Sequence, residues 1–441
     1  MRRTLVWTTV LSLSCAAAAF AQNVGGGGVF PPNEVDQIKV DLTIEKGVKY
    51  LKARNADHLK IFQFINRPMS HCELVAFTYV HADVPDSDAD LKALIDDMIQ
   101  RQLAATYCVS LQAMVLEEVE RVKYQKRILQ CAQFLVDNQS AQGWWGYGSP
   151  SIFVDDVTYD LPKRKDVASG GGVPIGGGAR EFQLPSNGQR VKPPVKNRIK
   201  VVKKRDGEEH DNSNSQYATL GMRACHDAGI ILPPNVIDLS IKWFRDSQKK
   251  EQAQEEELVE GGVNGPEVPK GGTVASVRRK AMPEGWSYTG NAHPAYGSMT
   301  AGAVGSLSIW DYIKDNDDGK KRSWKTDKDI HEGLVWLAKN FSVTYNPGPY
   351  EHANDEVNSK HQYLYYMYAL ERAGMLYGTE VIGAHKWYPE GAKVLIDTQK
   401  ADGSWGDGTV DTCFAILFLK RATRSLGVAT YTAQQMRQGQ R

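Results

Sequence analysis

The chain has 441 residues, of which 41% are hydrophobic and 24% are charged, and its formal net charge is +1. This composition is that of a globular protein with ample apolar material for a large core. Because the chain is nearly neutral, its overall charge gives no reason to expect a nucleic acid or an anionic membrane as a partner.

Residues 1–21 have the pattern of a targeting segment. A charged start at Arg2-Arg3 is followed by an apolar stretch and by the cleavage pattern Ala19-Phe-Ala21. We therefore expect the mature protein to begin near Gln22 and to be exported, to the periplasm or to the outside of the cell. Lipidation at Cys15 is a weaker alternative, because the residues before it fit that signal poorly. No later apolar stretch is long enough to span a membrane.

The chain contains five further cysteines, which are Cys72, Cys108, Cys131, Cys225 and Cys413. An odd number at wide spacings is not a disulfide framework, even in an oxidising compartment. Each lies within an apolar helical pattern, where cysteine behaves as a small hydrophobic residue. We therefore expect buried free thiols.

The rest of the chain divides into a flexible leader over 22–40, a repeat region over 41–422 and a polar tail over 423–441. In the repeat region, an amphipathic helix is followed each time by a helix that is often apolar nearly all round. Six such pairs are predicted, which in chain order are 41–54 with 72–81, 89–103 with 106–116, 128–135 with 215–228, 237–248 with 296–313, 330–341 with 360–373, and 387–399 with 411–421.

Two long insertions interrupt the repeats, at 146–212 in the third pair and at 249–281 in the fourth. The first carries a run of Lys and Arg over 190–205, and the second is rich in Glu between 251 and 260. The two insertions would be solvated loops, or would meet each other, or the basic run would hold an anionic polymer or lipid headgroup. They would also cover a mouth of the cavity, because insertions in repeat folds emerge at helix ends.

A helix pair that cannot bury its apolar face alone must stack on copies of itself. Open arrays of such pairs need polar capping repeats, and neither end of this chain has one. Closure into a ring removes this need, with the apolar helices inside and the amphipathic helices outside. The pattern therefore favours an all-α closed ring over an open array.

One motif recurs at the ends of the amphipathic helices. Its copies are Gln399-Lys-Ala-Asp-Gly403-Ser-Trp405, Gln139-Ser-Ala-Gln-Gly143-Trp144, and the truncated Trp243-Phe244-x-x-x-Gln248. These copies resemble the QW motif of squalene–hopene and oxidosqualene cyclases, whose repeat also occurs in protein prenyltransferase β-subunits. The resemblance covers residues 41–422 and implies an (α/α)6 toroid. It also implies a structural role for the Gln and Trp residues, which tie helix ends together in that family.

The cyclases of this family protonate a polyene with an Asp-x-Asp-Asp motif, which Asp315-Asn-Asp317-Asp318 matches. Here the motif lies in a polar connection and is followed by glycine and three basic residues. A catalytic acid has to stay protonated in an apolar cavity. We expect these carboxylates to be solvated and ionised instead.

Prenyltransferases of this family bind zinc through an Asp-x-Cys pair and a later histidine. Asp411-Thr-Cys413 matches the pair, but no histidine follows His385. Asp411 and Cys413 also fit a helix cap and a core position. We therefore expect no cofactor, with zinc at these two residues as the alternative.

Superposition of the repeats places a set of residues near the first turns of the inner helices, which are His71, Cys72, Tyr107, Cys108, Gln216, Tyr296, His361, Asp411 and Cys413. If the ring closes, they converge on one mouth of its cavity. There they would bind a ligand, or Cys and His would bind a soft metal. The alternative is that the thiols pack in the core and the other residues cap helices.

These features lead us to expect a non-catalytic binding or scaffold protein, which uses the cavity mouth and the charged insertions. Its partner is unknown, and we assign no catalytic residue. One alternative is an isoprenoid enzyme, either a squalene or terpene cyclase or a prenyltransferase-like transferase. A carbohydrate-active enzyme on a similar toroid is a third hypothesis, which suits an exported protein but has no motif of its own.

Overall fold

The computed structural model describes residues 35–157, 173–174, 191–192, 195–209, 211–250, 254–260, 277–290, 293–320, 324–348, 362–424 and 426. Within these residues the chain is mostly helical and has only short strands, which confirms the prediction of an all-α fold. No helix among them has the length and apolar character needed to cross a bilayer. The expected targeting segment, most of the leader and nearly all of the tail lie outside the described residues.

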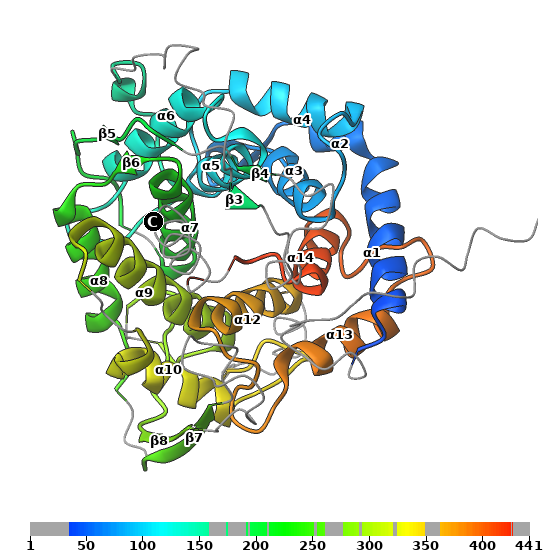
Figure 1. The fold of residues 1–441 in the computed structure, drawn as a ribbon, viewed down its shortest axis with the longest axis vertical. Coiled ribbons are helices and arrows are strands. Elements are labelled where there is room, and N and C mark those ends of the chain that lie inside the picture. The colour runs from blue at the N-terminus through cyan, green and yellow to red at the C-terminus, as the bar shows by residue number, and fades with distance from the viewer. Residues whose placement is uncertain are drawn as a thin grey trace, which may run out of the picture.

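The first helices of the predicted pairs lie at the periphery in Figure 1, and they are α1 (Gln37–Lys52), α4 (Ala89–Gln100), α6 (Gln125–Asp137), α8 (Pro234–Asp246), α10 (Lys328–Lys339) and α13 (Trp387–Thr398). The amphipathic pattern explains this position. In α4, for example, Leu91, Leu94, Ile95 and Met98 share one buried face. Helix α1 begins four residues earlier than predicted, because the carboxylate of Asp36 caps it.

Each peripheral helix is followed by one that lies nearer the centre, and these are α3 (Cys72–His81), α5 (Thr106–Glu120), α7 (Asn212–Asp227), α9 (Gly297–Asp318), α12 (Tyr363–Tyr377) and α14 (Thr409–Lys420). They are the apolar helices of the sequence pattern. In α14 every residue from Thr412 to Leu419 is buried. Each large apolar side chain buried in this way contributes roughly 1.5–3 kcal/mol to the free energy of unfolding.

The central helices contact one another in a cyclic order. Helix α3 contacts α5, α5 contacts α7, α7 contacts α9, α9 contacts α12, and α12 contacts α14. Helix α14 then contacts α3, which completes the cycle. Figure 1 shows the same order around the centre of the molecule. The last helix pair therefore lies beside the first, although they are at opposite ends of the sequence.

Short elements connect or extend the helices, and they are α2 (Asn55–His58), η1 (Ile152–Val154), η4 (Trp324–Thr326), and the strands β1 (Phe62–Phe64), β2 (Arg67–Met69), β3 (Val173–Pro174), β4 (Val191–Lys192), β5 (Ile199–Lys200), β6 (Ile230–Ile231), β7 (Glu256–Glu260) and β8 (Val277–Ala281). Strands β1–β2, β3–β4 and β7–β8 pair antiparallel, and β5–β6 pair parallel. Strands β7 and β8 contact α10, whereas β5 pairs with β6 after α7. These described parts of the two insertions therefore lie against different helices.

The recurring glutamine joins one peripheral helix to the next. Gln399 Nε2 donates to the carbonyl oxygen of Gly403, at 3.0 Å, and to that of Thr43 in α1, at 2.8 Å. Gln139 makes the same two bonds, to Gly143 at 3.1 Å and to Val236 in α8 at 2.8 Å. The family-based interpretation of this glutamine as a structural residue agrees with these contacts.

The glycine of the motif is required by its surroundings. Gly143 and Gly403 have φ angles of +103° and +92°, a region that side chains rarely adopt. A Cβ atom at either position would also lie 2.2 Å from the carbonyl oxygen of Leu239 or 2.5 Å from that of Lys46. The turn therefore touches the next peripheral helix, which leaves no room for a side chain.

The sequence analysis assigned the wrong tryptophan to the second copy of the motif. The indole of Trp405 is buried and donates to the carbonyl oxygen of Leu395, at 2.8 Å. The residue that repeats this contact is Trp145, which donates to Leu135 at 2.8 Å. Trp144 instead stacks on Trp243, with ring centroids 4.0 Å apart. The spacing already indicates this assignment, because Trp145 follows Gln139 by six residues, as Trp405 follows Gln399.

The third copy is complete, but the second insertion divides it. Gln248 Nε2 donates to the carbonyl oxygens of Glu284 and of Asp329 in α10, at 3.2 and 3.0 Å. The indole that belongs to this copy is Trp286, which is buried and donates to Phe244 at 2.6 Å. Residues 249–281 separate Gln248 from its tryptophan, so this copy looked truncated in the sequence.

Candidate functional site

Polar side chains at the first turns of three central helices form one hydrogen-bonded chain. The Tyr107 hydroxyl donates to Ser213 Oγ at 2.6 Å, and Ser213 Oγ is 2.5 Å from the Tyr365 hydroxyl. Gln216 Nε2 also donates to the Tyr365 hydroxyl, at 2.6 Å. The structure thus brings together Tyr107 and Gln216, both predicted from the sequence, with two residues that the superposition of repeats did not select. We call this end of the helix ring the tyrosine mouth.

The cysteines do not line this mouth. Cys72 is fully buried and donates to the carbonyl oxygen of Leu94 in α4, at 3.1 Å. Cys413 is also fully buried, and burial raises its pKa to about 12. Cys108 lies beside Glu73, and burial raises the pKa of its thiol well above the ordinary value. Cys72 and Cys413 are buried free thiols, as the alternative interpretation predicted, whereas Cys108 is a free thiol that is only partly buried.

The remaining predicted residues have separate environments. Asp411 is half-buried and accepts a hydrogen bond from the backbone of Asp407, at 2.7 Å, so it orders the turn before α14. His71 precedes α3 and lies against Phe62, with ring centroids 5.0 Å apart. Tyr296 precedes α9, and its backbone N–H donates to Trp286. His361 lies outside the described residues.

Within the part of the chain that the structure describes, the Asp411 and Cys413 pair has no third ligand. Across the described residues, no group of three or more His, Cys, Asp or Glu side chains is placed to hold a metal ion. The carboxylate of Asp411 accepts a hydrogen bond from the backbone N–H of Asp407, and the Cys413 thiol lies near Thr78 of α3. The described residues therefore do not form a complete zinc ligand set around this pair.

The acidic motif Asp315-Asn-Asp317-Asp318 forms the last turn of α9, so the expectation that it lies in a connection between helices is wrong. It is engaged in an ion cluster. Asp317 accepts from Arg198 of the basic insertion at 2.8 Å, and its Oδ1 atom is 3.3 Å from His226 Nε2. Burial acts to raise the pKa of Asp317, but the hydrogen bonds from His226 and Arg198 hold it below the ordinary value. An ionised carboxylate in this position cannot act as the proton donor of a cyclase.

A second cluster of charges lies at the C-terminal ends of the central helices, away from the tyrosine mouth. Glu117 and Glu118 are in the last turn of α5 and are buried. Lys192 of β4 is 2% exposed, and its Nζ lies 2.5 Å from Glu117 and 2.9 Å from Glu118. Arg424, which follows α14, contacts both carboxylates as well. Burial nevertheless raises the pKa of Glu117 to about 8.

The sequence analysis did not find this second cluster. Its two cations come from an insertion and from the start of the tail, and sequence spacing does not relate either one to α5. Several residues of the basic run form ion pairs within the protein. Lys192 pairs with Glu117, Arg198 with Asp317 and Lys203 with Asp206.

The segment after α14 covers this end of the ring. Glu371 of α12 accepts from the backbone and hydroxyl of Thr423, at 2.9 and 2.6 Å. Arg223 of α7 donates to the carbonyl oxygen of Arg424, at 2.8 Å. The segment lines a small cavity of about 50 Å³ together with His81 and other residues of α3, α5, α7 and α12.

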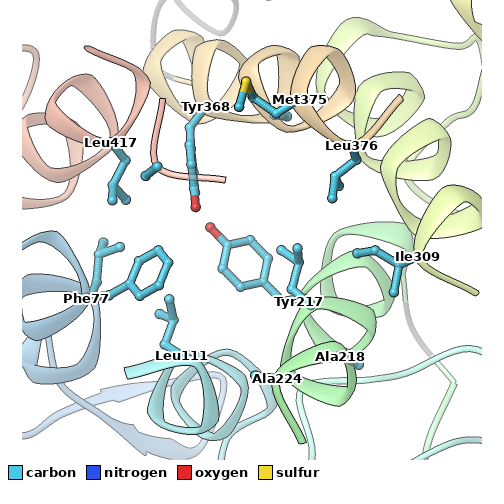
Figure 2. Packing of buried hydrophobic residues seen from close by; sticks show 14 of the residues in the cluster. Phe77, Leu111, Tyr217, Ala218, Ala224, Ile309, Tyr368, Met375, Leu376 and Leu417 are labelled. Atoms are coloured by element: carbon cyan, nitrogen blue, oxygen red, sulfur yellow. The ribbon is translucent and has the colours of Figure 1, made fainter. Parts of the chain in front are cut away.

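Side chains fill much of the space between the central helices. Figure 2 shows Tyr217 of α7 and Tyr368 of α12 meeting from opposite sides, with Phe77, Leu111 and Leu417 around them. All five are buried. These side chains meet between the central helices, and the small cavity at the end of the ring is lined by both apolar and charged residues.

The β-hairpin formed by β1 and β2 lies beside the tyrosine mouth and exposes apolar side chains. Phe62, Phe64 and Ile65 are 38%, 44% and 48% exposed. The ring centroids of Phe64 and Tyr147 lie 5.6 Å apart, and Arg67 donates to the carbonyl oxygen of Gly148. These contacts attach the hairpin to the mouth while leaving its apolar tip in solvent.

The hairpin turn places a β-branched residue in an unfavourable conformation. The two turn residues, Ile65 and Asn66, have φ angles of +48° and +57°. This geometry matches the right-handed twist of the strands and is common for asparagine, but it is strained for isoleucine. The fold gains little from an exposed apolar side chain held in this way.

No family model matches this chain, and no curated protein was found to be similar to it. The function is therefore argued from the geometry of the described residues.

Proposed function

We propose that the chain is an exported (α/α)6 toroid, whose residues 1–21 direct export. The cyclic order of contacts among α3, α5, α7, α9, α12 and α14 supports a closed ring. The repeated glutamine contacts support a common origin of the helix pairs, of the kind found in squalene cyclases and prenyltransferases. The long insertions and the C-terminal segment are additions to that ring.

We further propose that the protein binds another protein and is not a catalyst. The observation that carries this proposal is the exposed apolar hairpin tip, with Ile65 in a strained conformation, beside the tyrosine mouth. Exposed apolar groups of this kind mark interaction sites, and strained backbone concentrates where function needs it.

The charges around the hairpin favour a protein partner over an anionic lipid surface. Lys60 pairs with Asp57 at 2.6 Å, and Arg67 pairs with Glu208 at 2.8 Å. The hairpin therefore directs apolar groups outward while its cations are already paired. A partner that offers an apolar surface is the better match.

The interior supports neither isoprenoid alternative. A cyclase or a prenyltransferase needs an apolar chamber large enough for its substrate, whereas the cavity under the C-terminal segment measures about 50 Å³ and is bordered by Glu117, Glu118 and Arg223. A carbohydrate-active enzyme would need a pair of carboxylates across an open cleft, and no such pair stands out among the described residues.

A hairpin variant tests the proposal. Phe64→Ser combined with Ile65→Gly removes the apolar tip, while glycine suits the positive φ and preserves the turn. Val202→Ser is the matched control, because Val202 is also exposed, at 57%, but lies after β5. Each form would be cross-linked in the cell envelope of the producing cells, and the partner would be identified and purified for affinity measurement.

The expected result is that the parent and Val202→Ser bind the purified partner equally, while the hairpin variant binds at least tenfold more weakly. Equal binding by all three forms would reject the hairpin as the interface. A parallel assay with squalene and with a polyprenyl diphosphate plus a peptide acceptor, in the presence of zinc and magnesium, is expected to show no turnover. Turnover in that assay would overturn the non-catalytic proposal.

A further inference from the structure

Arg372 of α12 is a buried cation without a carboxylate partner. Its side chain is 2% exposed. Nη2 donates to Gln216 Oε1 at 2.8 Å, whereas Nη1 makes no hydrogen bond with any described residue. No Asp or Glu oxygen in the described part of the chain lies within ion-pair distance of this guanidinium. Its charge is therefore only partly compensated.

The aromatic rings beside Arg372 offset some of the cost of burying this charge. The guanidinium carbon lies 4.3 Å from the ring centroid of Tyr368 and 5.4 Å from that of Tyr217. Cation–π contacts of this kind are individually weaker than the penalty for burying an ion, so a stronger electrostatic partner is required.

The nearest carboxylate on α12 is directed elsewhere. Glu371 is fully buried and accepts two hydrogen bonds from Thr423. Burial raises the pKa of Glu371 to about 7, although the Thr423 hydrogen bonds and neighbouring arginines act to lower it. Near neutral pH this carboxyl is protonated in part, so that it only incompletely balances Arg372.

Two tyrosine hydroxyls close to Arg372 are also unpartnered. The hydroxyls of Tyr217 and Tyr368 are buried and have no partner at normal hydrogen-bond distance among the described residues, although Arg372 faces the first and Thr423 the second. Figure 2 shows that they point toward each other at the centre of the helix ring. A guanidinium N–H and two O–H groups are donors, and buried donors without acceptors indicate an absent ligand.

We propose that the centre of the helix ring binds a small monovalent anion, a halide or a short carboxylate, through Arg372 Nη1 and the hydroxyls of Tyr217 and Tyr368. One cation in a low-dielectric interior matches one negative charge. A multiply charged anion would carry negative charge that Arg372 alone does not balance. This site goes beyond the proposed function, because it lies inside the ring and does not involve the hairpin.

The test measures the stability and fluorescence of the mature protein in chloride, bromide, acetate and formate. Sodium gluconate would keep the ionic strength constant, because the gluconate ion is too large for the site. We expect a saturable rise in the unfolding temperature with at least one of these small anions, and a saturable change in tyrosine fluorescence with the same midpoint.

Two variants and one control make the test specific. Tyr217→Phe combined with Tyr368→Phe keeps the packing and removes both hydroxyls, and it should raise the half-saturating anion concentration at least tenfold. Arg372→Met should abolish the saturable response. Tyr79→Phe is the control, because the Tyr79 hydroxyl is buried and unpartnered among the described residues but belongs to α3. It should respond as the parent does.

The outcomes separate the two sources of the anion. A response to chloride and bromide alone identifies a halide site, and a response to acetate and formate identifies a carboxylate site. The proposal is overturned if no small anion gives a saturable response, or if the double tyrosine variant responds as the parent does. If Arg372→Met fails to fold, the tyrosine variant and the anomalous signal of bromide in a crystal still decide the question.

Discussion

The side-chain amide of Gln399 donates a hydrogen bond of 2.8 Å to the carbonyl oxygen of Thr43, across 356 positions of sequence. This bond attaches the last peripheral helix, α13, to the first, α1. The turn that follows Gln399 reinforces the contact, because Gly403 lies directly on the backbone of Lys46. The same device that links neighbouring pairs elsewhere thus joins the two ends of the repeat region.

Replacement of Gln399 by Ala should weaken this junction. The carbonyl oxygens of Thr43 and Gly403 lose their donor, which costs about 1–3 kcal/mol in the free energy of unfolding. Because α1 is then held by fewer bonds, its amides should exchange with deuterium faster than those of α8. Chemical denaturation and hydrogen exchange measure these two effects.

Gln139→Ala provides the comparison for that experiment. It removes the equivalent bonds between α6 and α8, within the repeat region rather than between its ends. It should cost a similar free energy but should accelerate exchange in α8 and not in α1. Faster exchange of α1 in both variants, or in neither, would contradict the role assigned to Gln399.

The apolar periodicity predicted the helices well, because a helix that faces other helices on all sides has to be apolar all round. In α14 this rule holds from Thr412 to Leu419. The direction in which a given residue points was harder to predict. Cys72 and Cys413 lie at equivalent places in their repeats, yet both point to neighbouring helices, because only a narrow part of each central helix faces the ring centre.

The charged cluster around Glu117 lay beyond prediction for a different reason. It depends on Lys192 and Arg424, which reach α5 from an insertion and from the tail. Neither segment has a periodic apolar pattern, so the sequence does not indicate which helix their side chains contact. Long-range contacts of this kind need coordinates, whereas the recurring Gln and Trp could be recognised from their local spacing.

The exchange of roles between Trp144 and Trp145 can be tested directly. Trp145→Phe removes the indole N–H that donates to the carbonyl oxygen of Leu135, and it leaves a small cavity. It should therefore lower the free energy of unfolding by about 2–4 kcal/mol. Trp144→Phe keeps an aromatic ring against Trp243 and should cost less than about 1 kcal/mol. Denaturant unfolding of both variants gives the comparison, and a larger loss for Trp144→Phe would restore the original assignment.

The thiols should be unreactive in the folded protein. Cys72, Cys131, Cys225 and Cys413 are all fully buried, and burial raises the pKa of Cys131 and of Cys413 to about 12. At pH 8 almost no reactive thiolate is present, and reagents cannot reach it. A thiol reagent such as dithionitrobenzoate should label these residues only as fast as the protein unfolds.

The control for this measurement is the same reaction in denaturant, where all thiols of the mature chain should react within seconds. Peptide mapping after partial labelling should find Cys108 first, because it is the cysteine whose residue is not fully buried among those described. Rapid labelling of Cys413 in the folded protein would show that its thiol is accessible. It would then favour the alternative that Asp411 and Cys413 bind zinc.

His226 should make the stability of the protein depend on pH. Burial acts to lower the pKa of His226, but hydrogen bonds and charge interactions with Asp227 and Asp317 together raise it to about 9, above its ordinary value of 6.5. A raised folded-state pKa contributes stability that is fully present below pH 6.5 and is lost as the pH rises through 9. The difference corresponds to a contribution of up to about 3 kcal/mol.

His226→Gln should therefore cost most near pH 6 and little near pH 9.5, as measured by denaturant unfolding across this range. His71→Gln is the control, because burial lowers the pKa of His71. The linkage sign is then opposite, so the cost of that change should not grow as the pH falls. A loss of stability in His226→Gln that is the same at pH 6 and pH 9.5 would mean that the imidazole acts in the folded protein through packing, without a charge shared with Asp227 and Asp317.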